Sequence, residues 1–570
     1  MFRKSGRRTL HLTVFAAFLG TALVAAGPAA SSTYTITADG TPLAVETTTA
    51  GENVRASFSG TAGQRVSLDI TDVTIGNSGC CSMRVWITKP DGTLLFKKTY
   101  VGTNGAFINT KTLPNNGTYK IFLDPEGTAK GEATLRLYTV PADLEIPATA
   151  DGSANLVSIG TPGQNARLPF SATADERVAL EVSGVTMGGV KVSIKKPDGT
   201  NLLGPVAVDA DGAFLGPKAI GANGTYKVLV DPQSRHTGDA TVRVHSVPAD
   251  VTGTLVAGGA AEDVTVGVPG QKARLTFSGS AGDRVSLDIT GVTIPHVQVK
   301  LLKPDNSQLG AVTVSSSEAF LDTKTLPVDG TYKVLVDPTE AHTGDVTLQL
   351  HDVPADATGP IAVETPLAST LSVPGQDASY TFNGTAGNRV AVDVSANSFD
   401  SVKIGVKKPD GTYLISPTTI SLADAFLDTK TLPVSGTYRV TVDPVGNATG
   451  SVTLTRYSVP ADASDSITID GATQSISTTV PGQNAALTFT AAADQDLFLD
   501  LSNVTFGDGP VSGAKVSVLK PDGSKLIFPQ SFGTSGWSDS LTTEGAGTYT
   551  IVIDPQGDLT GGVTAQLTSV

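Results

Sequence analysis

Cysteine, charge and aromatic side chains are all scarce in this chain. Two of its 570 residues are cysteines, 16% are charged and 6% are aromatic. Two cysteines cannot hold so long a chain together, so a disulfide scaffold is excluded. Low charge at a mean hydropathy of +0.06 also excludes a solvated, disordered chain.

Basic residues are fewer than acidic residues in this chain. The formal net charge is −14, which argues against nucleic acid and against anionic membrane surfaces as main partners, because an acidic protein repels both. Glycine and proline are plentiful instead, at 61 and 33 residues. Glycine and proline spread so regularly along the chain exclude long helices and favour short strands joined by turns.

The N-terminus predicts a secretory signal peptide, placed at residues 1–32. Arg3 to Arg8 are basic, Leu10 to Ala26 are apolar, and small residues follow from Ala25 to Ser31. An uncleaved membrane anchor is the alternative, but the apolar run is interrupted and short for a spanning helix. We expect cleavage between residues 26 and 34, no membrane attachment afterwards, and a secreted, extracellular protein.

Internal repeats organise the rest of the chain. A Lys-Pro-Asp turn recurs at spacings of 107, 107, 105 and 112 residues. It begins at Lys89, Lys196, Lys303, Lys408 and Lys520. A Gly-Thr-Tyr block follows each turn, and four junctions carry Val-Pro-Ala-Asp, starting at Val140, Val247, Val353 and Val459. Five copies account for the chain after the leader and leave no segment for a separate catalytic domain.

These motifs divide the sequence into six predicted parts. They are the signal peptide at 1–32 and five β-sandwich repeats at 33–143, 144–250, 251–356, 357–462 and 463–570.

Alternation of apolar and polar residues predicts β-strands with one buried face, as in Ala273 to Phe277 and Arg284 to Ile289. Lys-Pro-Asp-Gly predicts the tip of a hairpin, as between Val192–Ile194 and Leu202–Leu203. The fold class we predict is all-β, with five tandem antiparallel β-sandwich domains after the signal peptide.

Two recurring aromatic series are predicted to fill the cores, because most members stand alone in their strands and a sugar-stacking platform would need several together. They are Phe58, Phe170, Phe277, Phe382 and Phe489, and Phe107, Phe214, Phe320, Phe426 and Trp537.

The order Pro-Gly-Gln, Ala-Gly-x-Arg-Val, Lys-Pro-Asp-Gly, Gly-Thr-Tyr and Asp-Pro resembles the bacterial pre-peptidase C-terminal domain. The resemblance covers all five copies, although Asp175-Glu176-Arg177 and Asp494-Gln495-Asp496 depart from it. It implies a jelly-roll-like sandwich in an exported bacterial protein. Related modules imply adhesion to collagen or polysaccharide, sometimes with calcium, and the family usually accompanies a peptidase.

No catalytic constellation is visible, so we predict no catalytic residue and no enzyme. The histidines after the leader form no zinc-binding motif, and they are His236, His245, His296, His342 and His351. No nucleophile elbow or phosphate-binding loop occurs in a suitable context.

Calcium is the one cofactor left open, with no ligand assigned. Two acidic series recur at matching positions, namely Asp69, Glu181, Asp288, Asp393 and Asp500, and Asp124, Asp231, Asp337, Asp443 and Asp554. If members of the two series met at a sandwich edge, their oxygens could hold Ca²⁺. The alternative is a solvated strand face for the first series and strand-ending turns for the second.

Cys80 and Cys81 are adjacent, and in an exported protein they can form a vicinal disulfide, pair with another chain or simply stiffen a loop.

Together these patterns predict a non-enzymatic secreted or cell-surface-associated binding or spacer protein. Its expected partner is an extracellular polysaccharide or protein polymer, bound weakly at several sites. The alternatives are an accessory protein or inhibitor of an exported peptidase, or an enzyme with an unrecognised site in repeat 1 or 5, where Trp86 and Trp537 lie.

Overall fold

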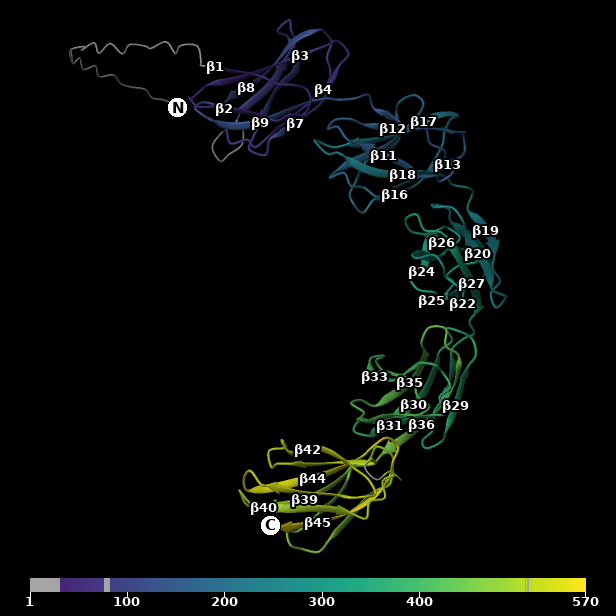
Figure 1. Cartoon of the computed structure of the whole chain (residues 1–570). Helices are drawn as coiled ribbons and strands as arrows, with labels where there is room; N and C mark the ends of the chain where they lie inside the picture. The colour runs from purple at the N-terminus through teal and green to yellow at the C-terminus, as the bar shows by residue number, and fades with distance from the viewer. Residues whose placement is uncertain (1–30, 76–82, 508, 510–511) are drawn as a thin grey trace, which may run out of the picture. The chain divides into compact units, whose positions relative to one another are not determined.

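A computed structural model describes residues 31–75, 83–507, 509 and 512–570. Throughout this part the chain is all-β, with 45 strands and no helix (Figure 1). No helix long and apolar enough to cross a membrane occurs in the described residues. Residues 1–30 of the predicted signal peptide, and both Cys80 and Cys81, lie outside the described residues.

The strands fall into five consecutive sets of nine, which we call repeats 1 to 5. Repeat 1 has β1 (Ser31–Thr35), β2 (Leu43–Thr47), β3 (Asn53–Gly60), β4 (Arg65–Thr71), β5 (Met83–Thr88), β6 (Leu94–Val101), β7 (Ala106–Thr112), β8 (Gly117–Pro125) and β9 (Gly131–Thr139). Repeat 2 has β10 (Leu144–Glu145), β11 (Asn155–Ile159), β12 (Ala166–Ala172), β13 (Arg177–Ser183), β14 (Val190–Lys195), β15 (Asn201–Val208), β16 (Ala213–Ala219), β17 (Gly224–Pro232) and β18 (Gly238–Ser246).

The remaining repeats follow the same plan. Repeat 3 has β19 (Val251–Thr254), β20 (Glu262–Val266), β21 (Ala273–Gly279), β22 (Arg284–Thr290), β23 (Val297–Leu302), β24 (Gln308–Val314), β25 (Ala319–Thr325), β26 (Gly330–Pro338) and β27 (Gly344–Asp352). Repeat 4 has β28 (Ala357–Pro360), β29 (Leu367–Leu371), β30 (Ala378–Gly384), β31 (Arg389–Ser395), β32 (Val402–Lys407), β33 (Tyr413–Ile420), β34 (Ala425–Thr431), β35 (Gly436–Pro444) and β36 (Gly450–Val459). Repeat 5 has β37 (Ala463–Ser466), β38 (Gln474–Thr478), β39 (Ala485–Ala491), β40 (Asp496–Ser502), β41 (Ala514–Leu519), β42 (Lys525–Phe532), β43 (Trp537–Thr542), β44 (Gly547–Pro555) and β45 (Gly561–Ser569).

Each repeat contains one five-stranded and one four-stranded sheet. In repeat 1 the strand orders are β1-β3-β8-β5-β6 and β2-β9-β4-β7, and the other repeats reproduce both orders. The two sheets share one hydrophobic cluster in each repeat. The core of a repeat is therefore built from both of its sheets.

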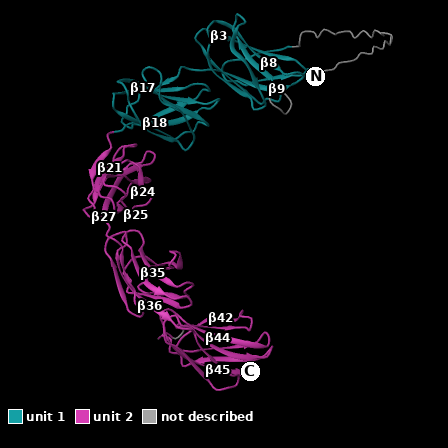
Figure 2. Cartoon of the chain, turned by 180° about the vertical axis from the view of Figure 1, so that it is seen from behind, with its two compact units in different colours: residues 1–247 teal, residues 248–570 magenta. Residues whose placement is uncertain are grey.

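The predicted fold class, five tandem antiparallel β-sandwich domains of jelly-roll type, is corrected in two respects. The five-stranded sheets are mixed, because the first strand of every repeat runs parallel to the third, as β1 does with β3. Alternation in a sequence shows which side chains share a face and says nothing of strand direction. The described chain also gathers into two compact units, residues 1–247 and 248–570, instead of five (Figure 2).

The predicted hairpin turns are confirmed. In the first, the Lys89 amide donates to the Thr93 carbonyl over 2.8 Å, and the Thr93 amide and hydroxyl both donate to Asp91 Oδ1. The turn joins β5 to β6, and its counterpart in repeat 2 brings Ile194 opposite Leu203.

The first aromatic series is confirmed as core. Phe58 and its four counterparts are buried, and each ring contacts the buried tyrosine of the Gly-Thr-Tyr block at centroid distances of 5.3–5.9 Å. Each tyrosine hydroxyl donates to the carbonyl four residues upstream, for example from Tyr332 to Val328 over 2.7 Å. This hydrogen bond fastens the preceding turn to the core.

The second aromatic series is not core as predicted. Phe107 pairs with Asp69, and residues of that face point away from the core because Leu68 and Ile70 point into it. Phe320 and Phe426 instead pack beside Gly375 and Gly482, which belong to the following repeat. Each ring lies 3.3 Å from the point that a Cβ added to the glycine would occupy. Trp537 differs from the series, since it packs partly against the core of repeat 5.

The sixth strand of every repeat is an edge of the five-stranded sheet. Three of these edge strands contain a proline, which lacks an amide donor and is suited to an edge. They are Pro205 in β15, Pro417 in β33 and Pro529 in β42.

Candidate functional site

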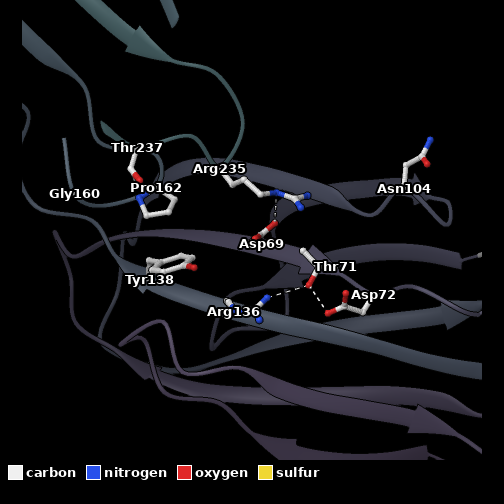
Figure 3. A pocket seen from close by; sticks show the side chains of 10 residues that line it. All are labelled: Asp69, Thr71, Asp72, Asn104, Arg136, Tyr138, Gly160, Pro162, Arg235 and Thr237. Carbon is white, nitrogen blue, oxygen red and sulfur yellow. Dashed lines mark hydrogen bonds and ion pairs between the residues drawn. The ribbon is translucent and has the colours of Figure 1, made fainter. Parts of the chain in front are cut away.

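A pocket lies in the first unit, where side chains of repeats 1 and 2 converge (Figure 3). Its volume is about 650 Å³. The lining is strongly polar and comprises Asp69, Thr71, Asp72, Asn104, Arg136, Tyr138, Gly160, Pro162, Arg235 and Thr237.

Asp69 and Arg235 form an ion pair in this pocket. Asp69 lies on β4 and Arg235 in the turn between β17 and β18, with Nε 3.1 Å from Oδ1. The aspartate side chain is only 5% exposed, whereas the arginine is 40% exposed. Burial raises the pKa of Asp69, and the Arg235 and Arg136 guanidinium groups partly oppose that rise.

A second set of contacts holds Asp72. Arg136 Nη1 donates to Thr71 Oγ1 over 3.0 Å, and Thr71 Oγ1 donates to Asp72 Oδ2 over 2.9 Å (Figure 3). Hydrogen bonds from the hydroxyls of Thr71 and then Thr134 lower the pKa of Asp72. Tyr138 lies beside these groups, and burial raises its pKa.

The pocket is thus equipped to bind polar groups through charge and hydrogen bonds. Two carboxylates and two guanidinium groups line it, and both carboxylates already have partners. None of the ten lining residues is a histidine or a cysteine. A hydroxyl nucleophile activated by an imidazole therefore cannot be assembled from this lining.

The first predicted carboxylate series occupies equivalent positions on the fourth strand of each repeat. Glu181 contacts Arg243 at 3.2 Å and His245 at 3.0 Å, and Asp288 contacts His351 at 2.9 Å. These partners come from the last strand of the same repeat. The series therefore forms cross-strand polar pairs, which is more than a solvated face.

In repeat 4 the same position lines a different pocket. Asp393, Asp424 and Asp558 contribute to a cavity of about 320 Å³ in the second unit. Burial, and then the charge of Asp558, raises the pKa of Asp393. Asp500, the last member of the series, pairs in register with Gln566.

The two carboxylate series do not meet. Asp69 belongs to the four-stranded sheet of repeat 1 and Asp124 to its five-stranded sheet, and the same separation recurs in each repeat. Two of the Asp-Pro aspartates have cationic partners among the described residues, Asp337 at 2.8 Å from Lys272 and Asp124 at 3.8 Å from Arg84. Within the described residues, no group of three or more histidine, cysteine or acidic side chains is placed to hold a metal. The proximity on which the calcium hypothesis depended is absent from these residues.

The junctions between successive repeats were missed as sites by sequence reasoning. Arg65, from the Ala-Gly-x-Arg motif, donates to the Pro141 carbonyl at 2.9 Å and to Asp143 Oδ1 at 2.7 Å. The counterparts Arg284 and Arg389 contact Asp356 and Asp462 at 2.7 Å. Two motifs identified separately in the sequence, Ala-Gly-x-Arg and Val-Pro-Ala-Asp, therefore contact each other in the folded chain.

Hydroxyl groups complete the same junctions. Ser67 and Thr110 donate to the carbonyls of Pro162 and Gly163 at 2.7 and 2.5 Å. In the second unit, equivalent bonds at 2.7 Å run from Ser286 to Pro374, from Thr323 to Gly375 and from Thr429 to Gly482. The Pro-Gly-Gln motif is thus the acceptor that each of these repeats presents to the one before it.

Two of the histidines make a contact that the sequence did not reveal. The rings of His296 and His342 lie 5.6 Å apart, with His342 also 3.9 Å from Glu340. His236 instead packs beside Gly188 and Gly189. Residues 508 and 510–511, between β40 and β41 of repeat 5, lie outside the described residues.

Comparison with known proteins identifies no family. No family model matches the chain, and no curated protein matches it. Solved structures show weak likenesses that carry no argument. They include the CUB1-EGF-CUB2 domain of human MASP-1/3, at 9% identity and a TM-score of 0.13, covering 36% of this chain and 99% of that one. The PBSX exported protein XepA shows 13% identity and a TM-score of 0.15, covering 35% and 87%. The M60 catalytic domain with CBM51 domains of Clostridium perfringens ZmpB shows 9% identity and a TM-score of 0.14, covering 73% and 55%.

Proposed function

We propose that this chain is a non-enzymatic, secreted or cell-surface-associated repeat protein that acts as a spacer and binds an extracellular polymer weakly at several places. The observation that carries the proposal is the set of hydrogen bonds and ion pairs at the junctions between successive repeats. An arginine of one repeat binds the linker aspartate, and hydroxyls of the same repeat bind the Pro-Gly carbonyls of the next. A chain of independent enzyme modules on free linkers has no need of such contacts, whereas a spacer does.

Repetition supports the binding part of the proposal. Each repeat presents equivalent outward strand positions, occupied by different polar groups such as Glu181 with His245 and Asp288 with His351. Weak sites on one chain raise the effective concentration for one another, so a polymer is retained even when each contact is weak.

The test is retention of the full secreted chain on insoluble peptidoglycan, chitin, cellulose and collagen, with and without a calcium chelator. We expect the chain to be retained on at least one polymer, and the retained fraction to fall as the amount of that polymer is lowered. A chain retained on none of them would refute the binding role. Loss of retention on chelation would bring calcium back as a cofactor.

Export can be tested on the same material. The first strand begins at Ser31, and Ser31 pairs with Asn53. We expect the secreted protein to begin at or before Ser31, which shortens the signal peptide placed at residues 1–32, because later cleavage would remove part of the paired strand. Mass spectrometry of the N-terminal peptide decides this, and an uncleaved leader would contradict it.

A second candidate, an enzyme with its site in repeat 1, is favoured by one observation. Asp69 and Asp72 share a pocket, and their pKa values shift in opposite directions, as in sites that pair an acid with a base. Turnover of a glycosidase and protease substrate panel that Asp69→Asn abolishes would establish this function over the first.

A further inference from the structure

Repeat 1 carries a row of four side chains on the outward face of its five-stranded sheet. Arg55 on β3, Phe122 on β8 and Trp86 on β5 lie directly opposite one another in register. Lys98 on β6 completes the row, with its Nζ 4.4 Å from the Trp86 ring centroid. We call Arg55, Phe122, Trp86 and Lys98 the cationic stripe.

The four side chains form one continuous stack. The rings of Phe122 and Trp86 are 5.0 Å apart and inclined by only 5°. The Arg55 guanidinium lies 5.2 Å from the centroid of Phe122, so a cation covers each outer ring face. Both faces of both rings are therefore occupied, and an approaching ligand meets the ring edges, which carry the positive end of the aromatic quadrupole.

The stripe is positively charged on an acidic protein. Neither Arg55 nor Lys98 makes an ion pair with a carboxylate among the described residues, although the chain carries a net charge of −14. Lys120 adds an exposed cation two residues from Phe122 on the same strand. Arg84 also lies nearby, but Glu126, at 3.0 Å, and Asp124, at 3.8 Å, neutralise it.

Among the described residues, this row occurs in repeat 1 and in no other repeat. The positions of Arg55, Phe122 and Trp86 are filled in the other repeats by residues with no aromatic ring. They are Arg167, Leu229 and Ser193 in repeat 2, Arg274, Leu335 and Lys300 in repeat 3, Ser379, Thr441 and Gly405 in repeat 4, and Ala486, Val552 and Ser517 in repeat 5. The fold therefore does not require the aromatic pair at these positions.

We infer that the cationic stripe binds an anionic polysaccharide chain bearing carboxylates at intervals. The inference rests on the proposed function and names the polymer class that repeat 1 takes. The stripe crosses four neighbouring strands, so its two cations are about 14 Å apart. A single small anion cannot reach both, whereas successive acidic sugars of one chain can.

The closed stack also selects between classes of polymer. Neutral sugars and single-stranded nucleic acids bind proteins by stacking on open aromatic faces, and the stripe offers none. Its attraction is for negative charge, with the Trp86 indole N–H as an additional donor. An acidic polysaccharide satisfies both conditions without needing a free ring face.

The experiment measures binding of the full secreted chain to soluble polygalacturonate, to its methyl-esterified form and to a thymidine oligonucleotide. Trp537→Phe leaves Trp86 as the single tryptophan and makes its fluorescence the reporter. We expect the emission to change with polygalacturonate, at least tenfold tighter binding to it than to the neutral ester, and weakening as salt rises.

The matched variants decide where binding occurs. Arg55→Gln with Lys98→Gln should weaken polygalacturonate binding at least tenfold. Trp86→Ser with Phe122→Leu, scored by direct retention, should also weaken it, and these are the residues that repeat 2 carries without loss of fold. Lys525→Gln with Phe528→Ser removes an exposed cation–ring pair from repeat 5 and should change nothing.

Unchanged binding by the Arg55 and Lys98 double variant would overturn the inference while leaving the proposed function in place. Equal binding of the neutral ester, or tighter binding of the oligonucleotide, would overturn it in the same way. Failure of the unaltered chain to bind polygalacturonate would also overturn it, and only retention on no polymer at all would remove the proposed function as well.

Discussion

Arg65 donates to Asp143 over 2.7 Å and so joins the body of repeat 1 to the linker that leads into repeat 2. The aspartate side chain is only 11% exposed, and Arg167 approaches its other oxygen at 2.9 Å. The linker is therefore held from both of the repeats that it connects.

Replacing Arg65 should loosen this linker. We expect Arg65→Gln to cost about 2 kcal/mol, because a charge-assisted bond to a largely buried carboxylate is lost. Limited proteolysis should then cut at residues 140–143 sooner than in the unaltered chain. Lys89→Gln is the control, since its contact with Asp91 is 4.0 Å long and exposed. Equal proteolysis of both variants would contradict the prediction.

Gly375 should tolerate no side chain. Its φ is +82°, and a Cβ there would overlap Thr323 Oγ1 and lie 3.1 Å from Ser286 Cβ. We expect Gly375→Ala to destabilise the second unit by about 2 kcal/mol more than Gly387→Ala. Gly387 has a similar φ of +87° and nothing within 4 Å, so the difference between the two variants isolates the close approach. Equal melting temperatures would show that the junction can yield.

The buried tyrosine hydroxyl should contribute measurably to stability. In Tyr332→Phe the Val328 carbonyl loses its donor at 2.7 Å, in a partly buried bond between the fully buried Tyr332 and Val328, which is 47% exposed. The loss of a partly buried hydrogen bond costs about 1 kcal/mol, so calorimetry should show a lower melting temperature. Tyr413→Phe, at a ring that is 42% exposed, should melt as the unaltered chain does. A loss of similar size in both would refute the role of the hydrogen bond.

Asp377 should make the second unit less stable as pH rises from 4 to 7. Burial, with the nearby Asp443, Asp356 and Asp322, raises the pKa of Asp377 from 3.8 to about 7. Between these values the folded state keeps a proton that the unfolded state has lost, so stability falls as pH rises and the loss is complete above about pH 7.

Asp377→Asn should therefore flatten the dependence of melting temperature on pH over that range. Asp410→Asn is the contrasting variant, because hydrogen bonds from Thr412 lower the pKa of Asp410 and its contribution is lost as pH falls. A pH profile of Asp377→Asn that matches the unaltered chain would contradict the assignment.

Asp69 and Arg235 should be energetically coupled. Arg235→Ala leaves a nearly buried carboxylate without its ion pair and should cost about 1 kcal/mol at pH 7. In an Asp69→Asn background the same substitution should cost less than half as much. A double-mutant cycle measured by thermal unfolding gives the coupling free energy, and strictly additive losses would show that the ion pair does not fasten the two repeats.

The sequence revealed the repeat, the turns and one face of the core, since these depend on neighbours along the chain. Lys-Pro-Asp-Gly forms its turn through Lys89 and Thr93, four residues apart. The parallel pairing of β1 with β3 could not be read in this way, because alternation is the same for either strand direction. Phe320 was misplaced for a related reason, as an apolar residue on an alternating strand does not show that a following repeat packs against it.

The sites were harder to predict than the fold. Trp86 was noticed by its rarity, but its partners come from three other strands and share no local motif with it. The Arg65–Asp143 contact joins two motifs that are visible in the sequence, yet nothing in either motif indicates that it contacts the other. Pairing across 78 residues is a property of the folded chain, and coevolving sequences would be needed to see it.

The prolines of the sixth strands bear on the aggregation of this protein with its own copies. Edge strands expose unpaired amides and carbonyls to neighbouring molecules, and a protein with five such edges multiplies the hazard of aggregation. Pro205, Pro417 and Pro529 each remove a donor from the middle of an edge, and Lys97 and Lys98 place like charges on the edge of repeat 1. A second chain therefore cannot extend the sheets of repeats 2, 4 and 5 in an unbroken ladder along these strands, which protects the protein from joining its own copies edge to edge.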